Sequence, residues 1–187
     1  MKSGSRAVGV AASDGGREGE TSVLCGAVVR ADRVVDGVSF ASCTVGGTDA
    51  TAAIERLVAE LDREDVQYVL IAGVAPAWFN VVDLGRLSTA TARPAVAISF
   101  EESAGLEPAI REAFDGAELE ERLATYRALP PRQSVSVNDR TLFVRSVGCD
   151  DEAAAHVVRA FTPDGGRPEP LRVARLAARG ARRWSER

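Results

Sequence analysis

The sequence predicts a mixed α/β fold in which an antiparallel three-stranded meander is extended by parallel strands. Three observations support this prediction. First, three strand-like segments follow one another with no helix between them, at 6–11, 21–30 and 33–45. Second, the hydrophobic spacing then changes from that of a strand to that of a helix. Third, two apolar strands at 66–73 and 94–100 alternate with helical segments, as in right-handed parallel crossovers.

The first half of the chain carries clear local signals. Only Ala31 and Asp32 separate the second predicted strand from the third, a connection of hairpin length. Hydrophobic residues then recur at i, i+3, i+4 and i+7, which predicts an amphipathic helix. The recurring residues are Ile54, Leu57, Val58 and Leu61. Thr48 or Asp49 is expected to cap the start of this helix by accepting backbone N–H bonds.

The segment 66–73 is almost continuously apolar, as expected of a central strand that is covered on both faces. A short helix is predicted around 81–91. The next strand, 94–100, begins with Pro94, which lacks a backbone N–H and is tolerated at the start of a strand.

The C-terminal part predicts helices near 106–127, a hairpin at 134–147 that turns at an Asn-Asp pair, and a helix at 151–161. A last helix follows, with Pro170 in its first turn, where a missing N–H costs no hydrogen bond.

This β-β-β-α-β-α-β order is that of the ribonuclease H-like fold. It predicts a mixed five-stranded sheet in the order 3-2-1-4-5 with flanking helices, to which a small C-terminal hairpin and helices are added. A chain of 187 residues is long enough to bury one sizeable core, so residues 1–187 are expected to form a single domain.

Composition excludes several classes of protein. No run reaches the roughly 18 apolar residues of a membrane span, and the N-terminal sequence lacks a secretory signal, so a cytoplasmic location is expected. Cys25, Cys43 and Cys149 are odd in number and widely spaced, which favours free thiols over a zinc site or a disulfide framework. The oligomeric state stays open.

Charge is concentrated at the C-terminal end. Residues 167–187 hold seven arginines and two glutamates, a net of +5. The other 16 basic and 25 acidic residues give −9. A basic helix that includes Arg172 can bind nucleic acid, and it can equally complement its own dipole, since cations favour a helix C-terminus.

The segment "LIAGVAPAWFNVVD" (70–83) is the candidate binding loop. It follows a buried strand, and ligands sit at strand ends in α/β sheets. Trp78 and Phe79 can stack on a nucleobase or fill the core beneath the loop. Asn80 can read a base edge or cap the helix at 81–91, and Asp83 can bind substrate or favour that helix's dipole.

Three segments in this order, "VGGTDAT" (45–51), "GVAPAWFNVVD" (73–83) and "RPEPLRVARLAA" (167–178), resemble the archaeal endonuclease dU family. That family is related to endonuclease V, which nicks nucleic acid near deaminated bases. The resemblance implies a ribonuclease H-like fold and carboxylates that hold Mg²⁺ or Mn²⁺ for phosphodiester cleavage. It assigns Asp49 and Glu169 as catalytic acids, with Asp49 as a metal ligand.

The chain departs from the family pattern at most of its acids. Where the pattern ends the first strand in Gly-Ile-Asp-Asp, this chain has Ala11 and Ala12. Gly47 belongs to a Gly-Gly pair where an Asp-Gly pair is expected, and Ala72 replaces the aspartate at the end of the fourth strand. Asp14 follows the first strand and is a further acid that can reach inward.

These departures argue against metal-dependent cleavage, because methyl groups cannot ligate a cation. The resemblance therefore implies an endonuclease V-like protein that recognises DNA or RNA with deaminated bases. Mg²⁺ or Mn²⁺ is the cofactor if cleavage is retained, and no cofactor is expected otherwise. The alternative is a module that reuses the cleft to bind a small molecule or a protein.

Overall fold

The structure of the protein is a computed structural model that describes residues 1–13 and 15–187. Asp14, one of the candidate acids, lies outside the described residues. The strands are β1 (Arg6–Ala12), β2 (Thr21–Arg30), β3 (Val35–Thr44), β4 (Val66–Ala72), β5 (Ala95–Ser99), β6 (Gln133–Val137) and β7 (Arg140–Val147). The helices are α1 (Ala50–Leu61), α2 (Leu84–Thr91), α3 (Glu107–Ala113), α4 (Gly116–Arg127), α5 (Asp151–Ala160) and α6 (Glu169–Ser185).

The described strands form one sheet of seven in the order β3-β2-β1-β4-β5-β7-β6. β4 runs parallel to its neighbours β1 and β5, and the other neighbouring pairs are antiparallel. The order of the first five strands and the mixed α/β class confirm the ribonuclease H-like prediction.

The limit of five strands is wrong, because the β6–β7 hairpin extends the sheet instead of lying beside it. β7 pairs antiparallel with β5, with Val144 opposite Ile98. Leu142 and Val144 are buried in the same core cluster as Ile98 and the apolar face of α5. Pairing with β7 also satisfies the backbone groups on the outer side of β5, which an open edge would leave unpaired.

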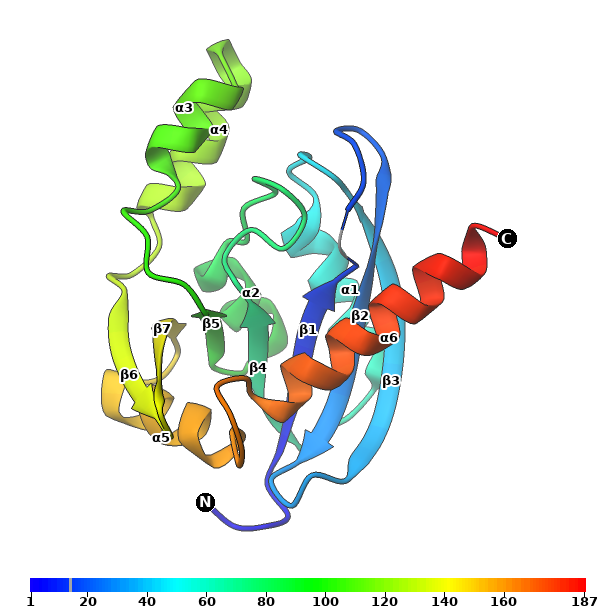
Figure 1. The fold of residues 1–187 in the computed structure, drawn as a ribbon, viewed down its shortest axis with the longest axis vertical. Helices are drawn as coiled ribbons and strands as arrows, with labels where there is room; N and C mark the ends of the chain where they lie inside the picture. Colours follow the sequence, from blue (N-terminus) through cyan, green and yellow to red (C-terminus); the bar gives the residue numbers. More distant parts are fainter. Residues whose placement is uncertain (14) are drawn as a thin grey trace.

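Helices cover both faces of the sheet (Figure 1). α1 and α2 pack on one face, where they share a core with the side chains of Val8, Val10 and Ala12. α5 and α6 cover the opposite face, to which Ala7 and Ala11 point. The pair α3 and α4 projects past the carboxyl ends of β4 and β5 (Figure 1). This arrangement leaves the strand ends below α3 and α4 as the place for a site.

α6 lies close to β1, and a glycine makes this approach possible. A Cβ atom at Gly9 would overlap the backbone of Pro170, so only glycine fits at this point of β1. The first turn of α6 is thereby fixed above the middle of β1, and the rest of the helix crosses β2 (Figure 1).

Two predicted helices have different boundaries in the structure. The segment expected at 81–91 becomes helical only at Leu84, because Asp83 is extended and caps it. The segment near 106–127 contains two helices, separated where Phe114 and Asp115 adopt extended backbone. Gly116 then opens α4 with a φ of 52°.

The three cysteines are free, as predicted. Burial raises the pKa of both Cys25 and Cys43 to about 12, so their thiols are protonated at neutral pH and unreactive. Among the described residues, no helix combines the length and the apolar character that crossing a membrane requires.

Candidate functional site

The loop that joins β4 to α2 holds the aromatic residues of the candidate site. It leaves the sheet at Gly73, whose φ of 79° lies in the left-handed region. Trp78 and Phe79 also have positive φ, at 39° and 48°. Two successive non-glycine residues in this region are uncommon and persist only where their surroundings impose the conformation. The loop is therefore held in shape by contacts outside itself.

The side chain of Asn80 makes several of these contacts. Its side chain is completely buried, and its Nδ2 donates to the Thr44 carbonyl and to Asp49 Oδ1, both at 2.7 Å. Its Oδ1 accepts from the Ala50 N–H at 2.9 Å. Asn80 thus caps α1 from a different part of the chain. The predictions that Thr48 or Asp49 caps this helix, and that Asn80 caps the following one, are wrong.

Asp49 does not cap because its carboxylate turns back toward the end of β3. Oδ1 accepts from the Thr44 N–H at 3.0 Å, and Oδ2 accepts from the Thr44 hydroxyl at 3.0 Å. Burial disfavours the ionised carboxylate, but the hydrogen bonds from Thr44 and Asn80 outweigh it and hold the pKa of Asp49 below its usual range. Asp49 is therefore a charged anchor for the loop, with both oxygens engaged.

Asp83 closes the other end of the loop. Its carboxylate caps α2 by accepting from the Arg86 N–H at 2.9 Å, and its own N–H donates to Thr51 Oγ1 at 3.0 Å. The expectation that Asp83 favours the start of this helix is confirmed. A role for Asp83 in binding substrate stays a prediction.

Trp78 and Phe79 belong to an aromatic cluster with Phe114. The three ring centroids lie 5.0 to 5.9 Å apart. The side chain of Arg122, from α4, is only 5% exposed. Its guanidinium stacks on Phe114 at 3.8 Å and donates to the carbonyl of Gly46. Trp78 itself keeps 41% of its surface exposed, so the cluster supports one aromatic face without covering it.

The positions where the family pattern has aspartates on β1 and β4 form an apolar cluster. Ala11 is buried against the small residues Ala174 and Ala178 of α6, and Ala72 packs against the same cluster with Val173. Ala12 faces the other side of the sheet, in the core shared with α1. No oxygen or nitrogen ligand is supplied by the side chains of this cluster.

Glu169 lies away from Asp49. Its carboxylate forms an ion pair with Arg172 at 2.6 Å. The hydrogen bond from Arg172 lowers the pKa of Glu169, and the charges of Arg172 and Arg33 lower it further, although burial alone would raise it. Arg33 lies in the β2–β3 turn, beside the N-terminal end of β1, whereas Asp49 follows the end of β3 near the C-terminal end of β1. The structure therefore does not bring the two predicted catalytic acids together.

These residues do not fit the metal site that the resemblance implies. Hydrogen bonds occupy the oxygens of Asp49, and Arg172 neutralises Glu169. Across residues 1–13 and 15–187, no three side chains of His, Cys, Asp or Glu are grouped so as to hold a metal ion. No catalytic step through Mg²⁺ or Mn²⁺ follows from this arrangement.

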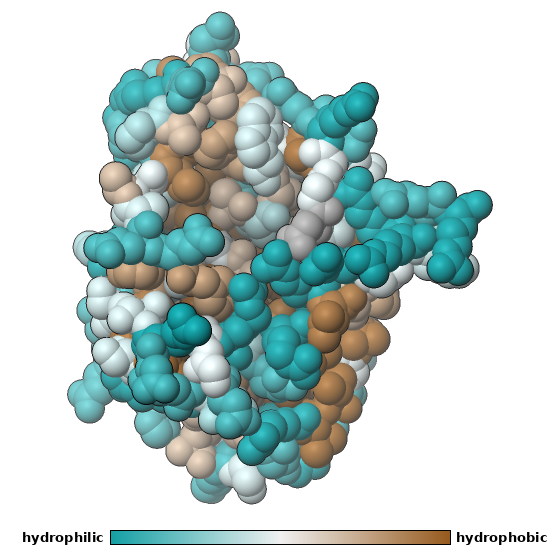
Figure 2. Space-filling view, viewed as in Figure 1, coloured by the Kyte–Doolittle hydropathy of each residue, from teal (hydrophilic) through white to brown (hydrophobic). Residues whose placement is uncertain are grey.

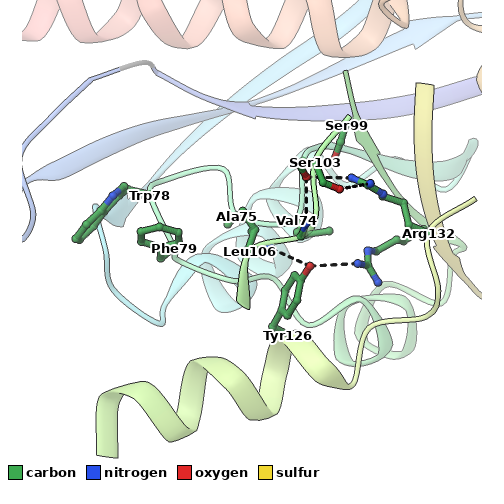
Figure 3. A pocket seen from close by; sticks show the side chains of 12 residues that line it. Val74, Ala75, Trp78, Phe79, Ser99, Ser103, Leu106, Tyr126 and Arg132 are labelled. Atoms are coloured by element: carbon green, nitrogen blue, oxygen red, sulfur yellow. Dashed lines mark hydrogen bonds between the residues drawn. The ribbon is translucent and has the colours of Figure 1, made fainter. Parts of the chain in front are cut away.

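A pocket opens beside the aromatic loop, beyond the carboxyl ends of β4 and β5 (Figure 3). Its volume is about 270 Å³. At one end lie Trp78 and Phe79, and at the other lie Tyr126 and Arg132. Arg145 also lines the pocket and donates to the Tyr126 hydroxyl, so it belongs to the same end. Hydrophobic residues gather in the hollow between the α3–α4 pair and the rest of the molecule (Figure 2). Trp78 also borders a second pocket of about 510 Å³ over the end of β1.

Sequence reasoning missed the basic end of this pocket. Tyr126, Arg132 and Arg145 come from α4, from the segment before β6 and from β7, so no local motif joins them. The predicted hairpin at 134–147 contains Arg145, but its pairing with β5, which brings Arg145 to the pocket, is not predicted from the sequence.

The comparisons with known proteins agree with this architecture. The family model described as endonuclease dU matches residues 3–182. A UPF0215 protein of Thermococcus kodakarensis is 37% identical over 161 residues, which cover 85% of this chain and 80% of the relative. A UPF0215 protein of Pyrobaculum aerophilum is 33% identical over 165 residues, which cover 87% of each chain.

Solved structures share the fold at lower identity. A protein of unknown function from Archaeoglobus fulgidus has a TM-score of 0.81 at 22% identity, covering 94% of this chain and 97% of that one. Human endonuclease V has a TM-score of 0.68 at 17% identity, covering 98% and 86%. Endonuclease V of Ciona intestinalis, in complex with inosine-containing DNA, has a TM-score of 0.67 at 14% identity, covering 97% and 87%.

Proposed function

Because the chain belongs to the endonuclease dU family, we propose that it recognises nucleic acid with deaminated bases and does not cleave it with a metal ion. The observation that carries the proposal is the contrast between two parts of one strand end. Ala72 closes β4 in an apolar cluster, while the loop that follows holds Trp78 in a fixed, half-exposed position.

The proposed absence of cleavage follows from the small number of carboxylates available to hold metal ions. Two Mg²⁺ ions need several carboxylates that converge within a few ångströms, because Mg²⁺ gives up its water reluctantly. Ala11 and Ala72 supply methyl groups where two of these carboxylates are expected, and separate partners engage the two remaining acids, Thr44 with Asp49 and Arg172 with Glu169. Asp49 and Glu169 are therefore proposed as structural acids.

Recognition rests on the aromatic loop. The Asn80 network fixes the loop before any ligand arrives, so little conformational entropy is lost when a base stacks on Trp78. A single stacked base contributes about 1–3 kcal/mol. Human and Ciona intestinalis endonuclease V share the fold, and the Ciona protein is described with inosine-containing DNA. A strand with an accessible deaminated base is thus the proposed ligand.

The test is a binding titration with single-stranded DNA and RNA that contain uracil or inosine, followed by gel analysis after incubation with Mg²⁺ or Mn²⁺. Binding without nicking is expected. Trp78→Ala should weaken it about 5- to 150-fold, the equivalent of one lost stacking contact. Trp184→Ala is the matched control, because Trp184 is 78% exposed near the end of α6 and lies outside the pocket.

Metal-dependent nicking by the unmodified protein would overturn the proposed loss of cleavage. If no oligonucleotide binds, or if Trp184→Ala weakens binding as much as Trp78→Ala does, recognition through the aromatic loop is wrong. The small-molecule or protein-binding module would then be the remaining interpretation of the cleft.

A further inference from the structure

We propose that the basic end of the pocket binds the phosphate monoester of a nucleotide, held by Tyr126, Arg132 and Arg145. The proposal rests on the proposed function, because it places a nucleoside toward Phe79, and it adds a chemical group that stacking does not require. The phosphate can belong to a free nucleotide or to the end of a strand, and both present the same doubly charged group.

The two arginines are fixed in position by neutral partners. Arg132 donates to the Ser103 carbonyl at 2.6 Å and to the Ser103 hydroxyl at 3.2 Å, and its guanidinium stacks on Phe143 at 4.5 Å. Arg145 donates to the Pro130 carbonyl and to the Tyr126 hydroxyl, above whose ring it lies at 5.4 Å. Stacked guanidinium groups offer their remaining N–H donors at the edge, which is the geometry that phosphate oxygens accept.

Within residues 1–13 and 15–187, neither Arg132 nor Arg145 has an acidic partner. No ion pair joins Arg132 or Arg145 to a carboxylate within the described part of the chain, and none of the described residues that line the pocket is Asp or Glu. Two half-buried positive charges that share one pocket repel each other. In a chain with a net charge of −4, this pocket is a local site where an anion is stabilised.

Tyr126 provides a third donor. Its hydroxyl oxygen accepts from the Leu106 N–H at 3.0 Å and from Arg145 Nη2 at 3.4 Å. Gly105 permits this approach, because a Cβ atom there would lie 2.8 Å from the hydroxyl oxygen. The hydroxyl oxygen therefore accepts two hydrogen bonds, but within the described residues no group accepts the hydroxyl proton. Tyr126 lines the pocket, so a bound ligand can supply that acceptor. A phosphate oxygen is the acceptor that this donor lacks.

The opposite end of the pocket suits the rest of a nucleotide. Val74, Ala75 and Leu106 line its apolar floor between the basic end and Phe79 (Figure 3). The volume of about 270 Å³ is close to the lower limit of small-molecule sites, roughly 300 Å³, so it accommodates one nucleotide and not a duplex.

The experiment compares the binding of deoxyuridine 5′-monophosphate, deoxyuridine and inorganic phosphate to the full chain by calorimetry. The monophosphate is expected to bind at least about tenfold more tightly than the nucleoside. Tyr126→Phe keeps the ring and removes only the hydroxyl, and Arg132→Gln removes one charge; each should abolish most of this preference. Arg159→Gln is the control, because Arg159 is exposed, donates to the Ser136 carbonyl and lies outside the pocket.

A second arm uses one oligonucleotide with either a 5′-phosphate or a 5′-hydroxyl. A preference for the phosphorylated strand that Tyr126→Phe removes identifies a strand end as the source, and a preference confined to the mononucleotide identifies a free nucleotide. Equal binding of monophosphate and nucleoside, or equal losses in the control variant, overturns the proposal.

The two proposals fail in different ways. If hydroxyl-ended oligonucleotides bind in a Trp78-dependent manner but phosphate adds nothing, the phosphate site is wrong and the proposed function stands. If no oligonucleotide binds but the monophosphate does, with loss in Arg132→Gln, the proposed function is wrong and the phosphate site stands.

Discussion

The side-chain amide of Asn80 donates to the carboxylate of Asp49 at 2.7 Å, and this contact joins the loop after β4 to the turn after β3. The same amide caps α1 through Ala50. The position of Trp78 therefore depends on the start of a helix that is distant in sequence and adjacent in space.

Removing Asn80 is expected to destabilise the fold. Asn80→Ala leaves the Ala50 N–H without its partner and removes one of the two hydrogen bonds that the Thr44 carbonyl accepts, and each lost hydrogen bond costs about 0.5–1.5 kcal/mol. A loss of about 2–4 kcal/mol in the free energy of unfolding is expected in urea titrations. Ser42→Ala, at an exposed position on β3, should change it by less than about 0.5 kcal/mol. Equal effects of the two substitutions would contradict the role of the network.

Stability should depend on pH through Asp49. Its pKa is lowered in the folded protein, so its contribution is fully present above the unfolded value of about 3.9 and is lost as pH falls through the folded value. Asp49→Asn should be less stable than the unmodified protein at neutral pH, and the difference should shrink below about pH 4. A difference in unfolding free energy that stays constant down to about pH 2 would contradict this assignment.

Two glycines should respond in opposite ways to alanine. A Cβ atom at Gly46 would lie 2.7 Å from Cε3 of Trp78, at a residue whose φ is 74°, so Gly46→Ala should cost about 1–3 kcal/mol and displace the indole. Gly180, in α6, has open space around it, and Gly180→Ala should stabilise the protein by about 0.5–1 kcal/mol. Thermal unfolding of both variants checks the difference, and a gain for Gly46→Ala would refute it.

Metal binding should be recoverable by restoring carboxylates. Ala11 and Ala72 continue the register in which Val10 pairs with Ile71, and both face α6. The double variant Ala11→Asp/Ala72→Asp should lower the melting temperature, because two like charges enter an apolar cluster. Mn²⁺ should reverse part of this loss and should leave the melting temperature of the unmodified protein unchanged. A large Mn²⁺-induced rise in the unmodified protein would show that a metal site survives.

The chain should unfold as one unit. The described strands form one sheet with core on both faces, so a single transition is expected by calorimetry, with equal calorimetric and van't Hoff enthalpies. Two resolved transitions would show that the prediction of a single domain is wrong.

Local sequence patterns predicted most of the helices and strands, but they did not predict which distant segments contact one another. The helical spacing of Ile54 and Leu57 located α1, and the continuous apolar run of β4 placed it at the centre of the sheet. The hairpin was also located, but nothing within 134–147 states that it pairs with β5. Its attachment depends on the free edge of another strand.

The candidate site shows the same limit. The loop with Trp78 was found because strand ends carry ligands, and the family was identified from three segments that the comparisons confirm. Asn80 was assigned to the nearest helix, because capping is usually local, whereas its partner Ala50 lies 30 residues earlier. The family resemblance assigns Asp49 and Glu169 together as catalytic acids, and the sequence does not show that Thr44 and Arg172 engage them separately.

The position of α6 also bears on how the protein is made. β1 and β2 are synthesised early, yet the residues that cover one face of them, Ala174 and Ala178, are added after almost all the rest of the described chain. Ribosomes add about 5–20 residues per second, so Ala11, Cys25 and Ala27 are exposed to solvent for seconds before α6 is synthesised. During translation this exposed apolar face is a surface that chaperones can bind. A chain that ends before Glu169 would keep the face exposed and would be prone to aggregation.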